Sequence, residues 1–372
     1  MAADCQASRN SRTGMTVALD MEQRMPTFSA LAPSMRGLAK RLKLRHAKRD
    51  QLRISRRRNG EAWTYHMPDG EEITNEAVIK RLSSLAMPPA YEEVFYALDE
   101  RAHLQAIGRD AAGRLQYRYH PDWEKVREAA KAQRLAELVE VLPKIRRTVT
   151  QHLGASEPTR AFALAAIIEL VSGSAIRPGS EEYTKKHGSR GAATLLKSNV
   201  RVSDDMITLV FRGKSGKDIR KEFKSPRLAT AIEMLKKLPG RRLFQYRDDE
   251  GTVRRVSARD VNAFLREMAD CNISLKDFRT LCASASVLEH LARTVPAASA
   301  TGRRKQVREA VRLAAEELAN TPAVCRRSYV HDAVVTAFEG GVLEDFAATL
   351  KSCRSPSRRE QFLAQVVATA TA

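Results

Sequence analysis

The sequence has few cysteines and no arrangement of residues that is typical of a metal site. Its 372 residues include five cysteines, an odd number, which lie far apart and form no CxxC pair. This spacing fits neither a disulfide framework nor a structural zinc site, so we expect reduced thiols. An HExxH sequence and a closely spaced aspartate pair of the kind that forms a magnesium site are also absent. We therefore expect no metal and no other cofactor.

Long hydrophobic runs are missing as well. No apolar stretch is long enough to span a bilayer, and none has the form of a secretory signal. We accordingly expect no membrane partner and a cytoplasmic location.

Acidic residues are outnumbered, with 44 Asp and Glu against 64 Lys and Arg, which gives a net charge of +20. This excess favours a polyanionic partner, and nucleic acid before a membrane surface.

The basic residues are concentrated near the N-terminus. Residues 34–58 contain eleven Lys or Arg and one Asp, which accounts for half of the net charge. Residues 1–33 show neither a helical nor a strand period. We expect residues 1–48 to be a disordered basic leader that raises affinity for nucleic acid without setting sequence preference.

Residues 49–121 predict a small β-rich domain. Leu52 and Ile54 alternate with polar residues, and Asn59-Gly60 is a strong hairpin signal. A short helix is expected over 75–85, followed by strands over 93–98 and 102–107. The strand that follows these places Tyr117 and Tyr119 on one face. Such aromatic residues among amide and basic side chains suit a nucleic-acid groove, and a half-buried strand explains them equally well.

Helical periodicity dominates after residue 121. Two or three helices are expected over 122–153 and a buried one over 158–171. The segments NVRV, MITLVF and DIRKEF then predict a three-stranded antiparallel sheet. Further helices are expected over 226–238, 257–269, 275–291, 303–318 and 322–338, and residues 346–372 form a tail. The predicted fold class is α+β, with a small antiparallel β-rich domain before a larger, mainly helical one.

The segment LANTPAVCRRSYVH contains a candidate nucleophile. Thr321-Pro322 has the pattern of a helix start, with a hydroxyl N-cap before proline. Tyr329 follows two arginines and precedes His331, so a local positive field would favour its phenolate. Free tyrosine ionises only near pH 10, so a nucleophilic phenol needs this kind of help.

Three cations could accompany this tyrosine. Lys214 is expected at the tip of a two-stranded ribbon, because the GKS sequence there lacks the earlier glycine of a phosphate loop and precedes a strand. Arg177 and Arg279 are expected at the edge of the core. They could pair with Glu181 and Asp277, or they could together hold one phosphate through bidentate hydrogen bonds.

Five ordered blocks of the sequence resemble the type IB DNA topoisomerases of the poxvirus and bacterial kind. In chain order they are QAIGRDAAGRLQYRYHPDW, IRPGSEEY, FRGKSGK, LKDFRT and NTPAVCRRSYVH. The resemblance covers residues 50–341. It implies an N-terminal DNA-clamp domain over 49–121 and a catalytic domain over 122–345. It further implies a nucleoid-associated monomer that closes around double-stranded DNA.

The resemblance also implies roles for the candidate residues. Tyr329 would attack a backbone phosphorus and hold the 3′ end as a phosphotyrosine. Arg177 and Arg279 would stabilise the transition state, and Lys214 would donate a proton to the departing 5′ oxygen. The activity implied is relaxation of positive and negative supercoils without ATP or metal.

Other residues fall at positions of the family that contact DNA. Lys276 lies where the family places a residue beside the scissile phosphate, and Gln116, Tyr117 and Tyr119 match a strand that touches DNA. Asn320 stands where the poxvirus pattern has a histidine that donates to a non-bridging oxygen. An amide can donate the same hydrogen bond without adding positive charge.

Two other functions are compatible with these residues. A tyrosine recombinase or integrase uses a similar nucleophile and arginine pair, but it usually has a histidine where this chain has Lys276. A non-catalytic DNA-binding protein that retains the fold is the second alternative, because Asn320 departs from the poxvirus pattern. A covalent adduct on the DNA 3′ end would separate an enzyme from a binding protein.

Overall fold

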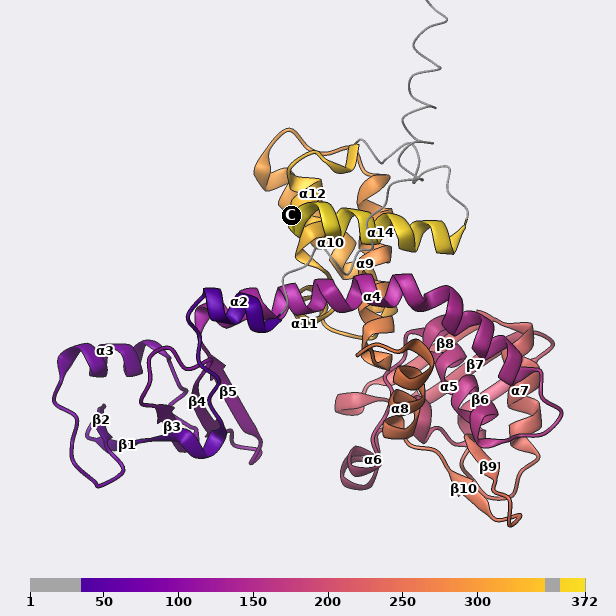
Figure 1. Ribbon diagram of the computed structural model, residues 1–372, viewed down its shortest axis with the longest axis horizontal. Coiled ribbons are helices and arrows are strands. Elements are labelled where there is room, and N and C mark those ends of the chain that lie inside the picture. Colours follow the sequence, from indigo (N-terminus) through magenta and orange to yellow (C-terminus); the bar gives the residue numbers. More distant parts are fainter. Residues whose placement is uncertain (1–34, 345–354, 372) are drawn as a thin grey trace, which may run out of the picture. The chain divides into compact units, whose positions relative to one another are not determined.

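The computed structural model of the chain describes residues 35–344 and 355–371 (Figure 1). These residues form two compact units, and the division between them falls after Lys131. Sequence patterns placed the domain boundary at residue 121, ten residues earlier. Residues 1–34 of the expected leader, and Cys5 and Cys353, lie outside the described residues. The basic remainder of that leader includes helix α2 (Met35–Arg41).

The N-terminal unit is organised around a five-stranded antiparallel sheet in the order β2-β1-β3-β4-β5. The Asn59-Gly60 hairpin forms as predicted, with Gly60 at a φ of +61°. Asn75 caps the expected helix by accepting a hydrogen bond from the Val78 amide at 3.2 Å. The elements of this unit are β1 (Leu52–Asn59), β2 (Ala62–His66), α3 (Glu76–Ser84), β3 (Glu92–Ala97), β4 (Leu104–Arg109) and β5 (Leu115–Tyr119).

Helix α4 (Pro121–Leu153) is one continuous helix of 33 residues, so the prediction of two or three helices over 122–153 is wrong. Pro143 lies inside it. Proline in a helix interior removes one backbone hydrogen bond and usually kinks or ends the helix. Here Val139, Leu142 and Ile145 are all buried in the core on either side of the proline. We infer that this burial offsets the lost hydrogen bond.

The C-terminal unit is mainly helical and contains the predicted three-stranded sheet in the order β6-β7-β8. The short helix α6, the β9–β10 hairpin and helix α14 were not predicted. Its elements are α5 (Arg160–Ser174), α6 (Glu181–His187), β6 (Val200–Ser203), β7 (Met206–Arg212), β8 (Asp218–Lys224), α7 (Pro226–Lys236), β9 (Gln245–Arg247), β10 (Val253–Arg255), α8 (Ala258–Ala269), α9 (Leu275–Ala292), α10 (Ala300–Glu317), α11 (Pro322–Ser328), α12 (Asp332–Glu339) and α14 (Pro356–Thr371).

Helix α5 lies at the centre of this unit. Its residues are apolar on all sides, and nearly all of those from Phe162 to Val171 are buried, as predicted. A helix that is hydrophobic all round belongs in a core. It packs against α7, α8 and α9. The end of α5 is thereby fixed, and the chain that leaves it carries Arg177.

Helix α14 covers α9 and α12. Leu363, Ala364 and Val367 on this helix are buried. Two ion pairs attach its N-terminal half, one between Glu360 and Arg146 of α4 at 2.8 Å and one between Arg359 and Glu289 of α9 at 3.0 Å.

The α+β fold class is confirmed, with the antiparallel sheet preceding a mainly helical region that holds the smaller sheet. None of the helices in the described part of the chain combines the length and the apolar character needed to cross a membrane.

Candidate active site

Tyr329 lies in a break between two helices. Thr321 caps α11 by accepting from the Val324 amide at 3.3 Å, and Pro322 follows it, as predicted. The single helix expected over 322–338 is wrong, because α11 ends at Ser328 and α12 starts at Asp332. Tyr329 is the C-cap of α11, with φ −130° and ψ −25°.

The phenol of Tyr329 is 9% exposed and lies against a buried guanidinium. The Cζ atom of Arg279 is 4.9 Å from the centroid of the tyrosine ring. Burial raises the pKa of Tyr329, but the charges of Arg279, Arg177 and Lys276 lower it by more, so the pKa falls below 10.0. The phenolate is favoured as predicted, although the cations responsible are distant in the sequence. Arg326 instead pairs with Asp332 at 2.5 Å.

Arg279 projects from α9 and is only 1% exposed. Its guanidinium donates to the carbonyl of Ala175, at the end of α5, and to that of Leu318, at the end of α10, the latter at 3.1 Å. Helix C-termini carry partial negative charge, so both contacts favour a cation. The buried Nε of Arg279 has no hydrogen-bond partner among the described residues. It is a buried donor beside the phenol, and the same guanidinium lowers the pKa of Tyr329 through a side-chain hydrogen bond as well as through its charge.

Arg177 and Asn320 contact each other across 143 residues of sequence. Nη2 of Arg177 donates to Oδ1 of Asn320, and the buried Nδ2 of Asn320 has no hydrogen-bond partner in the described part of the chain. The loop that carries Arg177 is closely packed. A Cβ on Gly191 would lie 2.5 Å from the Arg177 carbonyl oxygen and 2.5 Å from the Gly179 nitrogen, so only glycine fits there.

The carboxylates considered as partners of the two arginines are used elsewhere. Glu181 pairs with Arg242 at 2.5 Å. Asp277 accepts hydrogen bonds from the backbone and hydroxyl of Ser274 at 2.9 and 2.8 Å, which caps α9. The geometry therefore favours the interpretation in which the arginines hold an anion.

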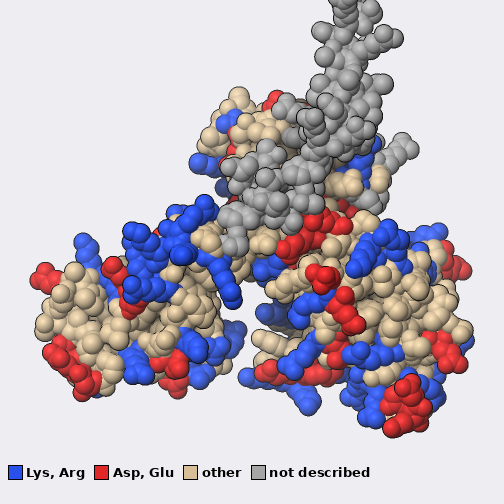
Figure 2. Space-filling model, viewed as in Figure 1, with Lys and Arg blue, Asp and Glu red and all other residues tan. Residues whose placement is uncertain are grey.

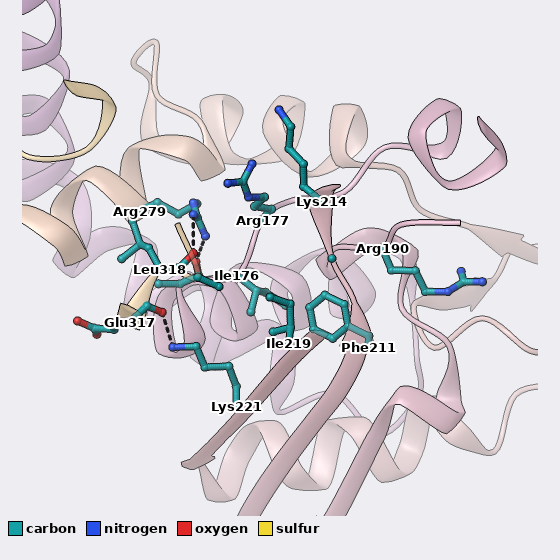
Figure 3. A pocket seen from close by; sticks show the side chains of 13 residues that line it. Ile176, Arg177, Arg190, Phe211, Lys214, Ile219, Lys221, Arg279, Glu317 and Leu318 are labelled. Atoms are coloured by element: carbon teal, nitrogen blue, oxygen red, sulfur yellow. Dashed lines mark hydrogen bonds between the residues drawn. The ribbon is translucent and has the colours of Figure 1, made fainter. Parts of the chain in front are cut away.

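A pocket joins three of the predicted cations. Arg177, Lys214 and Arg279 all line it. Figure 3 shows Arg177 and Lys214 extending toward the same side of this pocket, while Arg279 reaches in from α9. Lys214 is exposed at the tip of the β7–β8 ribbon, as predicted, and its Nζ is 5.9 Å from the centroid of Tyr183. Lys276 is exposed on α9.

One positioning residue was not found from the sequence. Ser284 of α9 is fully buried, and its hydroxyl donates to the carbonyl of Tyr329 at 3.0 Å and accepts from the His331 amide at 3.1 Å. His331 in turn caps α12 by accepting from the Ala333 amide. Ser284 therefore fixes the backbone on both sides of the break. Its setting in a run of small residues gave no signal of this role.

The predicted DNA-contacting residues of the N-terminal unit lie on β5, an edge strand of the sheet. The rings of Tyr117 and Tyr119 stack at 6.1 Å, so they share one face as expected. Arg49 lies 5.3 Å from the centroid of Tyr117, and Tyr119 is 39% exposed. Gln116 donates to Asp110 at 2.8 Å. The face combines aromatic and cationic groups, which suits nucleic acid.

Basic residues are also clustered on helix α2. Figure 2 shows Lys and Arg side chains gathered over this helix on the visible face. All of its basic residues, Arg36, Lys40 and Arg41, are exposed. Such a cluster provides an electrostatic site for a phosphate backbone.

Comparisons with known proteins agree along most of the chain. Residues 120–353 match the family described as "Eukaryotic DNA topoisomerase I, catalytic core", and residues 62–110 match "Bacterial DNA topoisomerase IB, N-terminal domain". DNA topoisomerase 1B of Acanthamoeba polyphaga mimivirus is 31% identical over 284 residues, 74% of this chain and 84% of that protein. DNA topoisomerase I of monkeypox virus and DNA topoisomerase 1B of vaccinia virus (strain Copenhagen) are each 23% identical over 225 residues, 60% of this chain and 69% of each relative.

Proposed function

We propose, since the chain belongs to the type IB DNA topoisomerases, that it relaxes positive and negative supercoils through a transient 3′-phosphotyrosyl link to one DNA strand. Its family makes it a type I DNA topoisomerase, an isomerase that acts on DNA. The observation that carries the finer proposal is the contact between the phenol of Tyr329 and the guanidinium of Arg279, whose Nε is a buried donor without a partner in the described residues.

In the proposed reaction, the Tyr329 oxygen attacks a backbone phosphorus while the bond from phosphorus to the 5′ oxygen breaks. Lys214 gives a proton to the departing 5′ oxygen. Arg177 and Arg279 bind the non-bridging oxygens, where negative charge increases in the transition state. Return of the 5′ hydroxyl reverses each step and releases the tyrosine. Because the phosphodiester energy is retained in the adduct, resealing needs no ATP, and in this scheme the arginines and Lys214 stabilise the charge that a metal would otherwise stabilise.

Asn320 supplies a further donor in this scheme. Its Oδ1 accepts from Arg177, which leaves Nδ2 to donate to a non-bridging oxygen. Lys276 would act near the same phosphate, since its charge already lowers the pKa of Tyr329. Neutral Asn320 orients oxygen without adding charge, so the arginines carry most of the electrostatic stabilisation.

The N-terminal unit is proposed to bind the duplex through β5. The stacked Tyr117 and Tyr119, together with Gln116, would contact DNA there, and the exposed cations of α2 would contact phosphates. We propose that one copy of the chain closes its two units around the double helix. A cytoplasmic enzyme with this activity would be associated with the nucleoid.

Relaxation of supercoiled plasmid tests the proposal. The purified protein in EDTA should convert negatively and positively supercoiled plasmid to relaxed topoisomers, and detergent should trap protein on the 3′ end of a nick. Tyr329→Phe should lose both activities, whereas Tyr246→Phe, a tyrosine on β9, should retain them. Full activity in Tyr329→Phe, or no relaxation by the wild type, would contradict the proposal. Strand exchange between two specific sites would indicate a recombinase instead.

A further inference from the structure

Two cationic side chains from other elements donate hydrogen bonds to the last backbone carbonyls of helix α10. Its last turn forms a Schellman motif, in which the amide of Asn320 donates to the Ala315 carbonyl at 2.8 Å and that of Ala319 donates to the Glu316 carbonyl at 3.0 Å. Ala319 has the left-handed φ of +50° that this motif requires. The motif leaves two carbonyls at the end of the helix, those of Glu317 and Leu318.

These two carbonyls are bound by side chains. Arg279 donates to the Leu318 carbonyl, and Lys221 of β8 donates through Nζ to the Glu317 carbonyl (Figure 3). Carbonyls at a helix end need a partner, and a cation there also interacts favourably with the helix dipole. Arg279 already belongs to the proposed catalytic group, whereas Lys221 takes no part in the proposed reaction.

The position of Lys221 on its strand is unusual for lysine. Along β8, residues alternate between exposed and half-buried, and Lys221 shares the half-buried face with Ile219 and Phe223. Both of those neighbours pack against the core. A lysine at such a position must satisfy its ammonium group, and here the Glu317 carbonyl does so. This lysine on an apolar strand face was a signal available in the sequence.

The turn that Lys221 holds leads directly into the proposed active site. Asn320 follows Ala319, and Thr321 begins the helix that ends at Ser328, next to Tyr329. We propose, on the basis of the proposed function, that Lys221 is a positioning residue for DNA cleavage. By binding the Glu317 carbonyl it fixes the α10–α11 turn, so that Asn320 and Arg177 meet the phosphate in the reactive geometry. Lys221 lines the same pocket as Arg177 and Arg279, but its ammonium is bound to the Glu317 carbonyl, so we place its effect in the turn.

The test compares Lys221→Met, which keeps the apolar stem but lacks the donor, with Lys221→Arg, which restores a donor. Single-turnover formation of the covalent adduct on a nicked or suicide DNA substrate should slow about tenfold or more in Lys221→Met, because a small displacement of the groups that hold the phosphate is costly for the rate. Lys221→Arg should recover most of the rate. Lys224→Met is the matched control, because Lys224 is an exposed lysine of the same strand that pairs with Asp205.

Two further measurements separate positioning from general destabilisation. DNA affinity, measured in the Tyr329→Phe background, should change less than about twofold in Lys221→Met, because the defect lies in the reaction step. Combined with Asn320→Ala, the Lys221→Met effect should largely disappear, because both act through the same turn.

Each outcome then decides the proposal. A wild-type rate in Lys221→Met, full additivity with Asn320→Ala, or failure of Lys221→Arg to recover the rate would overturn the role of Lys221 and leave the proposed function intact. A defect in Lys221→Met that appears only as weaker DNA binding would do the same. Absence of adduct from the wild-type protein would overturn both proposals.

Discussion

The ionisation of Tyr329 is controlled by residues from other elements rather than by its chain neighbours. The sequence predicted a positive field from the two preceding arginines and His331. In the structure Arg326 pairs with Asp332, and His331 serves as a helix cap. The field comes from cations brought in by folding, chiefly Arg279. Local sequence therefore predicted the direction of the pKa shift of Tyr329 for an incomplete reason, because long-range contacts cannot be read from adjacent positions.

Removal of one of these cations should shift the pH dependence of cleavage. The pKa of Tyr329 is lowered, so adduct formation should increase with pH, with a midpoint below about pH 10. Lys276→Met removes a charge that favours the phenolate, so the pKa should rise and the midpoint should move to higher pH. Single-turnover rates between neutral pH and about pH 10 measure this. An unchanged midpoint would show that Lys276 does not act on the phenol.

The hydroxyl of Ser284 should matter for both stability and rate. Ser284→Ala removes one hydrogen bond each from the Tyr329 carbonyl and the His331 amide. Loss of such buried partners costs about 1–3 kcal/mol, which should appear as a lower free energy of unfolding in denaturant titrations. Adduct formation should slow as well, because the tyrosine backbone loosens. Ser286→Ala, two residues along the same helix, should leave both nearly unchanged, and equal effects in the two variants would refute the assignment.

For helices and strands, the sequence predicted which elements exist better than it predicted where a helix continues or breaks. The sheet β6-β7-β8 was recognisable from its alternating hydrophobic pattern, and the buried helix α5 from a long apolar run. The two or three helices predicted over 122–153 are the single helix α4, which continues through Pro143 because buried residues on either side hold it in the core. The break at Tyr329 was missed for the opposite reason. Local signals there continue the helix, and the contact with Ser284 lies 45 residues away.

Ala319, which ends helix α10 in a left-handed conformation, allows the turn to be tested through its effect on stability. Ala319 has a φ of +50°, a conformation that costs a residue with a Cβ about 1–2 kcal/mol relative to glycine. Ala319→Gly should therefore increase the free energy of unfolding, with about 1 kcal/mol expected after the added flexibility of the unfolded chain is included. Urea titration with an unchanged m-value would measure it. A decrease in stability would contradict the assigned role of the turn.

For the molecule as a whole, the net charge predicted nucleic acid as the class of partner. The division of the chain into two compact units was harder to predict. The net charge of +20 favoured nucleic acid, and the comparisons place the chain in a DNA-acting family. The two compact units divide within α4, ten residues after the predicted boundary, where the chain stays helical and neither composition nor period changes. Arg177, Lys214 and Arg279 were candidates from the residues alone, but their separate roles came from the resemblance, because no single motif unites these cations.

Salt dependence of DNA binding tests the role of the basic N-terminal region. Replacement of Arg36, Lys40 and Arg41 on α2 by glutamine should weaken binding and reduce the slope of log affinity against log salt by about 1 for each phosphate that these cations neutralise. Lysine in place of Arg36 and Arg41 keeps the charge and should preserve the slope. Cleavage-site preference should stay the same in both proteins. An unchanged slope in the glutamine variant would exclude these cations from the interface.

The position of helix α14 near the end of the chain determines when the C-terminal unit can complete its packing during synthesis. It packs on α12, which follows the nucleophile, and on α9, which carries Arg279. Its buried residues and its ion pairs to Arg146 and Glu289 can form only after residues 356–371 have left the ribosome. A nascent polypeptide would thus hold a nearly full set of reactive groups without the support that aligns them. The proposed cleavage activity is therefore expected only in chains in which this helix has been completed.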